Sequence, residues 1–322
     1  MRIIFMGTPD FAVPSLAILL ENNFDVVAVI TATDKKGGRG GKKIIESPIK
    51  KFANSKGIPV LQPPNLKSPK FIEELKSYAA DLQVVVAFRM LPEVVWNMPG
   101  KGTFNLHGSL LPKYRGAAPI NWAVINGEKE TGVTTFFIKH EIDTGDLLFQ
   151  EKIPIGEDDT AGNVHDRMMH VGADLVLKTV QAIAADNYEL KKQDESKVSK
   201  APKIFHETCE INFNKNAKNV HDFVRGMSPY PGAWTLVGDP ALLGDGSFWE
   251  KESWEKIKGE QLKIFKTSKI IIPHGLNTGQ LLTDGKKKLF VACQDGFIEI
   301  FELQLRGRKR MLTPDFLNGM RS

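Results

Sequence analysis

The sequence predicts a doubly wound α/β domain followed by a small β-barrel, and three observations support this prediction. Strand-like and helix-like segments alternate through the first half of the 322-residue chain. A polar segment at 186–203 then interrupts the pattern. Beyond it the chain consists mainly of short strands separated by Gly and Asp. The length also suits two domains of ordinary size.

Apolar runs rich in β-branched residues predict the strands of the first domain. The run Val26–Ile30 has no polar alternation, which is typical of a strand covered on both faces. The predicted strands are 3–6, 26–30, 82–88 and 103–106, with 134–138 and 147–153 as an antiparallel-type pair. In such a sheet the functional loops follow the carboxyl ends of the parallel strands.

Amphipathic or capped segments predict the helices. Asp10 is placed to cap a first helix that contains Phe11, Leu16 and Leu19. The other helices predicted in the first domain are 47–55, 69–78, 118–125 and 163–185, of which the last is the longest.

The segment 186–203 is polar, charged and poor in apolar anchors, so it is interpreted as a linker with little regular structure. The second domain is expected to contain a helix at 216–227 and strands at 234–237, 262–266, 289–292 and 297–303. We therefore expect a first domain at 1–188, a linker at 189–206 and a second domain at 207–322.

Composition excludes several classes of protein. The chain is 42% hydrophobic and 25% charged, as in an ordinary globular protein. Cys209 and Cys293 form no metal-ligand spacing and are interpreted as reduced thiols. The chain opens directly on a strand-like run, and no apolar stretch reaches the length of a membrane span, so we expect a cytoplasmic protein.

The net charge is +5, and its distribution says more than its size. Basic residues outnumber acidic ones clearly between Asp34 and Lys51. Further basic groups lie at Lys286–Lys288 and Arg306–Arg310. These groups are compatible with one extended polyanion as a partner, and equally with solvated surface.

The turn Gly7-Thr8-Pro9-Asp10 follows the first predicted strand. It lacks both the glycine pattern of dinucleotide-binding folds and the Lys-Ser/Thr of a phosphate-binding loop, which argues against nicotinamide or nucleoside triphosphate as ligands. It is either a tight strand-to-helix turn or a turn that lines a pocket.

Asn105 and His107 are the most informative pair in the chain. They stand two apart at the end of a predicted strand, so their side chains share one face. An amide donor beside a titratable imidazole suits a reaction in which a carbonyl oxygen becomes negative. Asp143, on a turn farther along the chain, can supply the carboxylate such a pair needs. It can also do no more than organise that turn, and the spacing leaves both interpretations open.

Four motifs resemble the folate-dependent formyltransferases. They are Phe-Asn-Leu-His-Gly-Ser-Leu-Leu-Pro-Lys-Tyr-Arg-Gly at 104–116, Ile-Asp-Thr-Gly-Asp at 142–146, the opening run at 5–12 and Pro-Tyr-Pro-Gly-Ala-Trp at 229–234. Together they cover both predicted domains, and within the superfamily the whole chain is most similar to members that act on aminoacylated tRNA. The resemblance implies a Rossmann-like formyltransferase domain with a C-terminal OB-like β-barrel.

The activity that the resemblance implies is transfer of a formyl group from 10-formyltetrahydrofolate to the α-amino group of initiator methionyl-tRNA, for translation initiation. Asn105 and a protonated His107 would stabilise the oxyanion that forms when the amine attacks, and Asp143 would help to move the amine proton. The acid and base roles within the His107–Asp143 pair stay open. No metal is expected, and the protein is expected to be a monomer.

By the same resemblance, binding roles fall on three segments. The folate-binding residues are expected to be Ser109, Leu110, Leu111, Pro112, Phe88, Met90 and Leu91. Arg89 stands where the family more often has a small residue, a departure that affects the expected pterin contacts. The tRNA-binding residues are expected to be Lys35, Lys36, Arg39, Lys42 and Lys43, with Arg39 near the end of the acceptor stem. Residues 238–260 form an apparent insertion, either packed on the barrel or in contact with RNA.

Three alternatives remain at the level of sequence. A formyltransferase could instead use a small amine, such as an amino-sugar nucleotide or glycinamide ribonucleotide, although the basic loop and the second domain argue against it. A 10-formyltetrahydrofolate hydrolase could use the same three side chains with water as the acceptor. A non-enzymatic RNA-binding protein would leave Asn105, His107 and Asp143 without a role.

Overall fold

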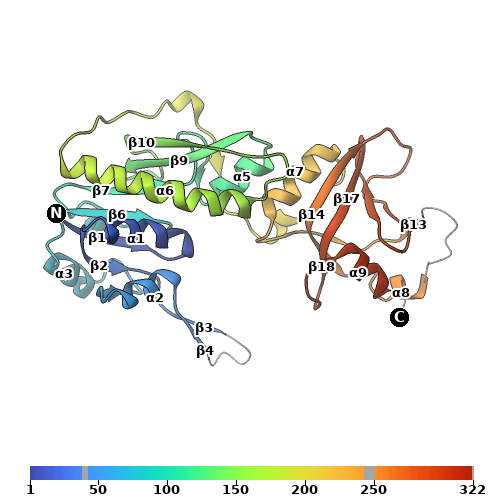
Figure 1. Ribbon diagram of the computed structural model, residues 1–322, viewed down its shortest axis with the longest axis horizontal. Helices are drawn as coiled ribbons and strands as arrows, with labels where there is room; N and C mark the ends of the chain where they lie inside the picture. Colours follow the sequence, from blue (N-terminus) through green and yellow to red (C-terminus); the bar gives the residue numbers. More distant parts are fainter. Residues whose placement is uncertain (38–42, 243–250, 321–322) are drawn as a thin grey trace. The chain divides into compact units, whose positions relative to one another are not determined.

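The chain divides into two units, each built on a seven-stranded sheet (Figure 1). The computed structural model describes residues 1–37, 43–242 and 251–320. Unit 1 comprises 1–119, 130–154 and 165–202, and unit 2 comprises 120–129, 155–164 and 203–322. The segments 120–129 and 155–164 therefore belong to unit 2, although both precede the predicted linker. The polar composition of 186–203 did not indicate this division.

Unit 1 contains the predicted doubly wound sheet. Its strands are β1 (Arg2–Gly7), β2 (Asp25–Ile30), β5 (Val60–Leu61), β6 (Leu82–Val86), β7 (Thr103–His107), β9 (Glu130–Phe137) and β10 (Leu147–Pro154). They lie in the order β10-β9-β7-β6-β1-β2-β5. The pairs from β7 to β5 are parallel, whereas β9 and β10 are joined antiparallel at the other edge. The α/β fold class predicted from the sequence is confirmed.

The strand order reverses between β1 and β6, and ligands of such sheets bind where this happens. Gly7 ends β1 at this position. A Cβ on Gly7 would stand 2.7 Å from the Cβ of Ala12 and 3.1 Å from the carbonyl oxygen of Val86. The absence of a side chain therefore lets the turn after β1 pass close to the end of β6.

The helices predicted for the first domain are present close to the expected positions, and one further short helix, at Glu93–Trp96, was not predicted. They are α1 (Val13–Glu21), α2 (Pro48–Ser55), α3 (Pro69–Ser77), α4 (Glu93–Trp96) and α6 (Ala161–Ala184), and α5 (Pro119–Ile125) begins where unit 2 takes over. Ser47 and Ser68 cap α2 and α3 by accepting hydrogen bonds from backbone amides.

The predicted cap at Asp10 is wrong. Asp10 lies inside a short 3-10 turn, Asp10–Ala12, and its carboxylate accepts from the next amide, Phe11 N. The α-helix begins only at Val13. Pro14 explains the shift, because it has no N–H to donate to the carbonyl of Asp10 and is tolerated only in the first turn of a helix.

Both faces of the unit 1 sheet are covered. On one face Ile4 and Met6 of β1 pack with Phe71 and Leu75 of α3 in a single apolar cluster. On β7 the side chain of Leu106 approaches α6, where its Cδ2 would lie 2.8 Å from a Cβ on Gly172. Leu106 thus faces α6, and because neighbours alternate along a strand, Asn105 and His107 face the opposite way.

Unit 2 carries a second sheet, antiparallel except for one pair. Its strands are β12 (Ala233–Leu236), β13 (Pro240–Leu242), β14 (Gln261–Ile271), β15 (Leu281–Thr283), β16 (Leu289–Ala292), β17 (Gly296–Leu305) and β18 (Met311–Leu312). The order is β12-β14-β17-β16-β15-β13, with β18 on β17, and among the described strands of this sheet β13 and β15 form the parallel pair. Burial alternates along much of β17, as expected for a strand with one face on a core.

Helices also accompany this sheet in the described part of unit 2. They are α7 (Ala217–Met227), α8 (Lys251–Glu255) and α9 (Thr313–Asn318). Trp254 of α8 is buried and meets the ring of Phe316 edge to face at 5.9 Å, so this part of the 238–260 insertion packs on the core of unit 2. Trp249, the other tryptophan of the insertion, lies outside the described residues.

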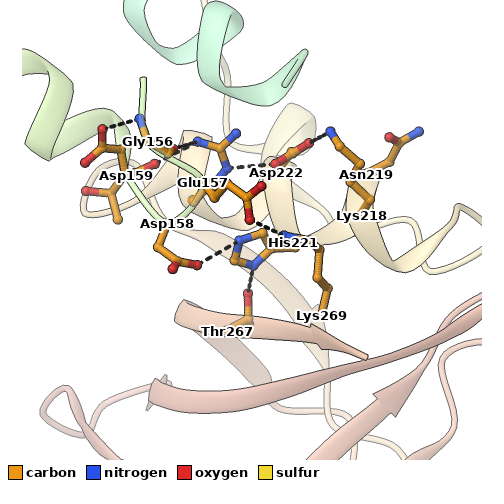
Figure 2. Close-up of polar contacts among 12 residues, drawn as sticks. Gly156, Glu157, Asp158, Asp159, Lys218, Asn219, His221, Asp222, Thr267 and Lys269 are labelled. Atoms are coloured by element: carbon orange, nitrogen blue, oxygen red, sulfur yellow. Dashed lines mark hydrogen bonds and ion pairs between the residues drawn. The ribbon is translucent and has the colours of Figure 1, made fainter. Parts of the chain in front are cut away.

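A buried polar cluster ties the segment 155–164 to α7 (Figure 2). Asp222 accepts from Arg225 Nε at 2.7 Å and pairs with Lys218 at 2.6 Å. Arg225 also donates to the carbonyl of Asp159 at 2.9 Å. His221 lies beside them and contacts Thr267 of β14. These contacts explain why the segment belongs to unit 2 although it stands between two elements of unit 1.

The segment 186–203 is held by contacts throughout unit 1. It contains a 3-10 turn, Glu195–Lys197, and the strand β11 (Lys200–Ala201), which pairs in parallel with β8 (Arg115–Gly116). Lys191 bridges to Leu147 of β10. The segment therefore follows the surface of unit 1 and is more than a free connector. Among the helices of the described ranges, none is both long and apolar enough to cross a membrane.

Candidate active site

The centre of the candidate site is the carboxyl end of β7, which lies between β6 and β9. The predicted strand is present, and it carries both Asn105 and His107. His107 is buried, whereas Asn105 is half-buried. The sheet therefore presents an amide and an imidazole on one face, where the chain turns away from the strand.

Two contacts fix the orientation of the His107 ring. Its Nε2 lies 2.9 Å from the carbonyl oxygen of Tyr114. Because a carbonyl oxygen can only accept, Nε2 donates this bond, and Nδ1 is left to face the carboxylate of Asp143 at 3.6 Å. A lone pair on Nδ1 would repel that carboxylate, whereas a proton between them makes the approach attractive. The geometry is suited to hold a proton at Nδ1.

Asp143 is positioned by its own backbone and by Gly116. Its φ is 57°, in the left-handed region that few residues other than Gly adopt. Its Oδ2 accepts a hydrogen bond from Gly116 N at 2.8 Å. Gly116 itself has φ 126°, and a Cβ there would stand 2.5 Å from the carbonyl oxygen of Ala201. A glycine is therefore required for the amide to reach the carboxylate.

The side chain of Asn105, unlike those of His107 and Asp143, makes no hydrogen bond to residues 1–37, 43–242 and 251–320, which the structure describes. Its amide is half-buried on the same strand face as His107. The structure thus joins His107 to Asp143 by direct contact and places Asn105 on the adjacent stretch of strand, with its donor and acceptor free for a ligand.

The turn after β7 is a rigid scaffold. Ser109 is fully buried and its hydroxyl donates to the carbonyl of Lys113 at 2.6 Å. Thr134 of β9 donates to the carbonyl of Ser109 at 2.6 Å and accepts from Leu111 N at 3.1 Å. Leu111 is buried in a small apolar cluster. Leu110 and Pro112 are half-buried, so they, with the backbone, are the parts of this turn that a ligand can reach.

The loop after β6 has a different character. Phe88 is half-buried, Met90 is 70% exposed, and Leu91 is buried in the core. Arg89, the residue that departs from the family pattern, donates to the carbonyl oxygens of Pro63 and Pro64. Its side chain thereby links the loop after β6 to the loop after β5. Of these two, the loop after β6 lies next to the point at which the strand order reverses.

Comparison with known proteins shows the family. Residues 1–180 match the family described as formyl transferase, and residues 203–321 match the formyl transferase C-terminal domain. The chain belongs to the formyl transferase family. The methionyl-tRNA formyltransferase of Bacteroides fragilis is 51% identical over 325 residues, or 99% of this chain and 95% of that one. The methionyl-tRNA formyltransferase of Flavobacterium johnsoniae is 46% identical over 99% of this chain and 96% of its own length.

Solved structures of more distant proteins share the fold. The sugar 3N-formyl transferase WlaRD, solved with dTDP and 5-N-formyl-THF, matches with a TM-score of 0.63 at 22% identity, over 96% of this chain and 99% of that one. HypX from Aquifex aeolicus, solved with tetrahydrofolic acid, matches with a TM-score of 0.63 at 16% identity, over 99% of this chain and 47% of that one. At these identities the likeness supports the formyl transferase fold alone.

The basic loop of this formyl transferase is an antiparallel hairpin of β3 (Lys35–Gly37) and β4 (Lys43–Ile45), drawn below α2 in Figure 1. Three of the predicted tRNA-binding residues, Lys35, Lys36 and Lys43, are exposed on it. The other two, Arg39 and Lys42, lie outside the described residues.

At the base of the hairpin, Lys50 pairs with Asp34 at 2.6 Å and Glu46 at 3.0 Å. Its hydrogen bond to Asp34 lowers the pKa of that carboxyl below its usual range. Lys50 is therefore engaged in anchoring the hairpin, although the sequence counted it with the basic excess. Ile44 and Ile45 are exposed on β4, an apolar feature that charge counting did not reveal.

Sequence reasoning also missed residues that support the site. Gln193 donates to the carbonyl of Asp143 at 2.8 Å, and Ser199 accepts from Tyr114 N at 2.9 Å. Both lie in the polar segment interpreted as a linker, where nothing in the composition pointed to the site. Arg115 and Gly116 belong to the motif at 104–116, but their contacts with this segment can be identified only in the structure.

Proposed function

We propose that this formyl transferase transfers the formyl group of 10-formyltetrahydrofolate to the α-amino group of initiator methionyl-tRNA. The observation that carries the proposal is the His107–Asp143 pair at the end of β7, beside the amide of Asn105, which makes no side-chain hydrogen bond to the part of the chain that the structure describes. Relatives at about half identity over nearly their whole length are named methionyl-tRNA formyltransferase, which supports the choice of acceptor. Because charged initiator tRNA is used in translation, the proposal places the enzyme in the cytoplasm.

The residues present fit a folate. The loop of Phe88, Met90 and Leu91 offers an aromatic and an aliphatic side chain at the position where the strand order reverses. The backbone and the accessible Leu110 and Pro112 lie on the turn after β7. Flat, apolar ring systems with polar edges suit such surroundings, because backbone groups can satisfy the edges. When bound, the folate supplies the formyl carbon that the amine attacks.

Asn105 and Asp143 would act on the reacting atoms, and His107 would hold Asp143 beside them. Asn105 Nδ2 would donate to the formyl oxygen as negative charge develops there, and loss of one such donor typically costs about 3–4 kcal/mol of transition-state stabilisation. His107 holds its ring by donating from Nε2 to Tyr114 and keeps Nδ1 toward Asp143. Asp143, with its Oδ2 also bound to Gly116 N, would accept the proton that leaves the attacking amine, directly or through a water. The proton would then pass to the folate nitrogen as the bond between that nitrogen and the formyl carbon breaks, which releases tetrahydrofolate.

The acceptor assignment rests on the hairpin. Lys35, Lys36 and Lys43 are exposed cations, and exposed cations bind phosphates with an affinity that falls as salt rises. The exposed Ile44 and Ile45 add apolar surface on the same hairpin. A small amine acceptor has no use for either feature.

The deciding experiment offers purified enzyme 10-formyltetrahydrofolate and three acceptors in parallel. These are methionyl-tRNA, a dTDP-linked amino sugar, and water alone. We expect N-formylmethionine, detected by mass after the ester is cleaved, only in the first reaction. Formylated sugar would identify a small-amine formyltransferase. Folate turnover without an acceptor, and without formylmethionine, would identify a hydrolase.

A second measurement tests the site. Asn105→Ala and His107→Ala should each lower turnover by about a hundredfold or more in variants that still fold and unfold cooperatively. Near-normal turnover in folded variants would remove these residues from the proposed chemistry.

A further inference from the structure

We infer that Gln193 and Arg115 are positioning residues for Asp143, so that the polar segment after α6 is a working part of the active site. The inference rests on the proposed role of Asp143. It goes beyond that role by assigning a function to residues that lie outside the proposed binding segments and are not among Asn105, His107 and Asp143.

Gln193 binds the backbone of the turn that carries Asp143. Its Nε2 donates to two backbone carbonyl oxygens, that of Asp143 itself at 2.8 Å and that of Gly145 at 2.9 Å. One amide group therefore fixes both ends of the short peptide segment in which Asp143 holds its left-handed φ of 57°. Such a conformation persists in a non-glycine residue only when its surroundings determine it.

Arg115 fixes Gln193 in turn. Its Nε and Nη2 donate to Gln193 Oε1 at 3.1 and 2.7 Å, which orients the amide so that its NH₂ group points at the turn. The Arg115 side chain is only 11% exposed, so the two hydrogen bonds to Gln193 Oε1 are shielded from water. Glu195 neutralises the arginine through contacts of 2.7 and 3.1 Å.

The backbone next to Arg115 also contacts the carboxylate of Asp143. Arg115 is followed by Gly116, whose N–H donates to Asp143 Oδ2. Asp143 is thus held at two points: the carbonyl by Gln193, and the carboxylate by the amide next to Arg115. A small rotation of the turn would move Oδ2 away from His107 Nδ1, which it faces at 3.6 Å. Displacements of about 1 Å at reacting groups can cost on the order of a hundredfold in rate.

The sharpest variant is Gln193→Glu. A glutamate keeps the length of the side chain and still accepts from Arg115, but it cannot donate to the carbonyls of Asp143 and Gly145. Gln181→Glu is the matched control, since it makes the same substitution at an exposed position of α6, away from the turn of Asp143.

We expect Gln193→Glu to lower kcat by tenfold to a hundredfold, on the order of a misplaced reacting group. The KM values for folate and tRNA should stay within about twofold, because Gln193 lies outside the segments proposed to bind either ligand. Gln181→Glu should stay within about twofold in all constants. The pH profile of kcat should also change shape, because the His107–Asp143 pair is disturbed. A purely structural role would lower the unfolding temperature and the amount of active enzyme without changing that profile.

A second readout needs no substrate. The pH titration of the His107 ring, followed by NMR with a His107→Gln spectrum for assignment, should differ between wild type and Gln193→Glu. This measurement separates the two proposals: inactivity of the wild type toward methionyl-tRNA would overturn the proposed function and leave the ring titration to judge the positioning role.

An unchanged kcat and an unchanged His107 titration in folded Gln193→Glu would overturn the inference. If that variant fails to fold, the same measurements on Gln193→Met decide, because methionine fills the space without placing a charge beside the carbonyls.

Discussion

Replacing Asp143 with asparagine separates the charge of this residue from its shape. The oxygen that accepts from Gly116 N is the same oxygen that faces His107 Nδ1, so an asparagine can keep the hydrogen bond at 2.8 Å and lose only the negative charge. The side chains of His107 and Asp143 are 6% and 12% exposed, which limits screening by water. Asp143→Asn is therefore a test of electrostatics with little change in packing.

The magnitude follows from the distance. Unit charges 3.6 Å apart attract by about 4–5 kcal/mol at an effective dielectric constant of about 20. Each 1.4 kcal/mol is about tenfold in rate, so the charge accounts for up to about a thousandfold. Reorientation of neighbouring dipoles will compensate for part of the lost electrostatic stabilisation. We therefore expect kcat to fall by about 10²–10³ with KM nearly unchanged.

Initial rates of N-formylmethionine formation at saturating folate give this number. Asp146→Asn is the matched control: the same substitution is made three residues later, where the carboxylate pairs with Lys139 at 2.8 Å on the outer side of the turn. A loss below about tenfold in Asp143→Asn, or an equal loss in both variants, would refute the electrostatic reasoning.

Three further predictions concern other parts of the chain. Gly116→Ala should lower the free energy of unfolding by about 1–3 kcal/mol and abolish activity, because a Cβ would meet Ala201 and the φ is positive. Gly100 has open space around it, so Gly100→Ala should leave the midpoint of urea unfolding unchanged. Burial lowers the pKa of His221, so its neutral form stabilises the fold above the ordinary value of about 6.5 and that stability is lost as pH falls. Urea midpoints between pH 8 and 5 should therefore decline less in His221→Gln, and parallel curves would contradict this. Lys36→Ala should reduce the slope of log(kcat/KM) for tRNA against log salt by about one unit, and an unchanged slope would remove this residue from the tRNA contact.

The fold was predictable where the local pattern and the final packing agree. The β-branched run at 26–30 is the strand β2, and serine followed by proline marks the starts of α2 and α3. The prediction failed at Asp10, where a capping residue was weighed without the proline four positions later. The assignment of 155–164 to unit 2 was also out of reach, because it depends on Arg225 meeting carbonyls nearly seventy positions away.

The site was predictable in part for a similar reason. Asn105 and His107 share a face by strand geometry alone, which needs only their spacing. The approach of Asp143 to His107 depends on a left-handed residue and on the amide of Gly116, neither of which leaves a periodic signal in the sequence. Gln193 left even less trace, since a glutamine in a charged segment looks like any solvated residue.

These contacts connect the site to the segment that lies between the two family matches. The matched ranges end at 180 and resume at 203, so the residues between them lie outside both. Yet Gln193 holds the turn of Asp143, Ser199 binds Tyr114, and Ala201 pairs with Gly116. A fragment ended at residue 188, the boundary that composition suggests, would lose all three contacts and leave the loop that orients His107 unsupported. Because the lost contacts are hydrogen bonds to backbone groups of the site, such a fragment should keep its sheet and lose its activity, whereas one that extends to residue 202 retains every contact that fixes the His107–Asp143 pair.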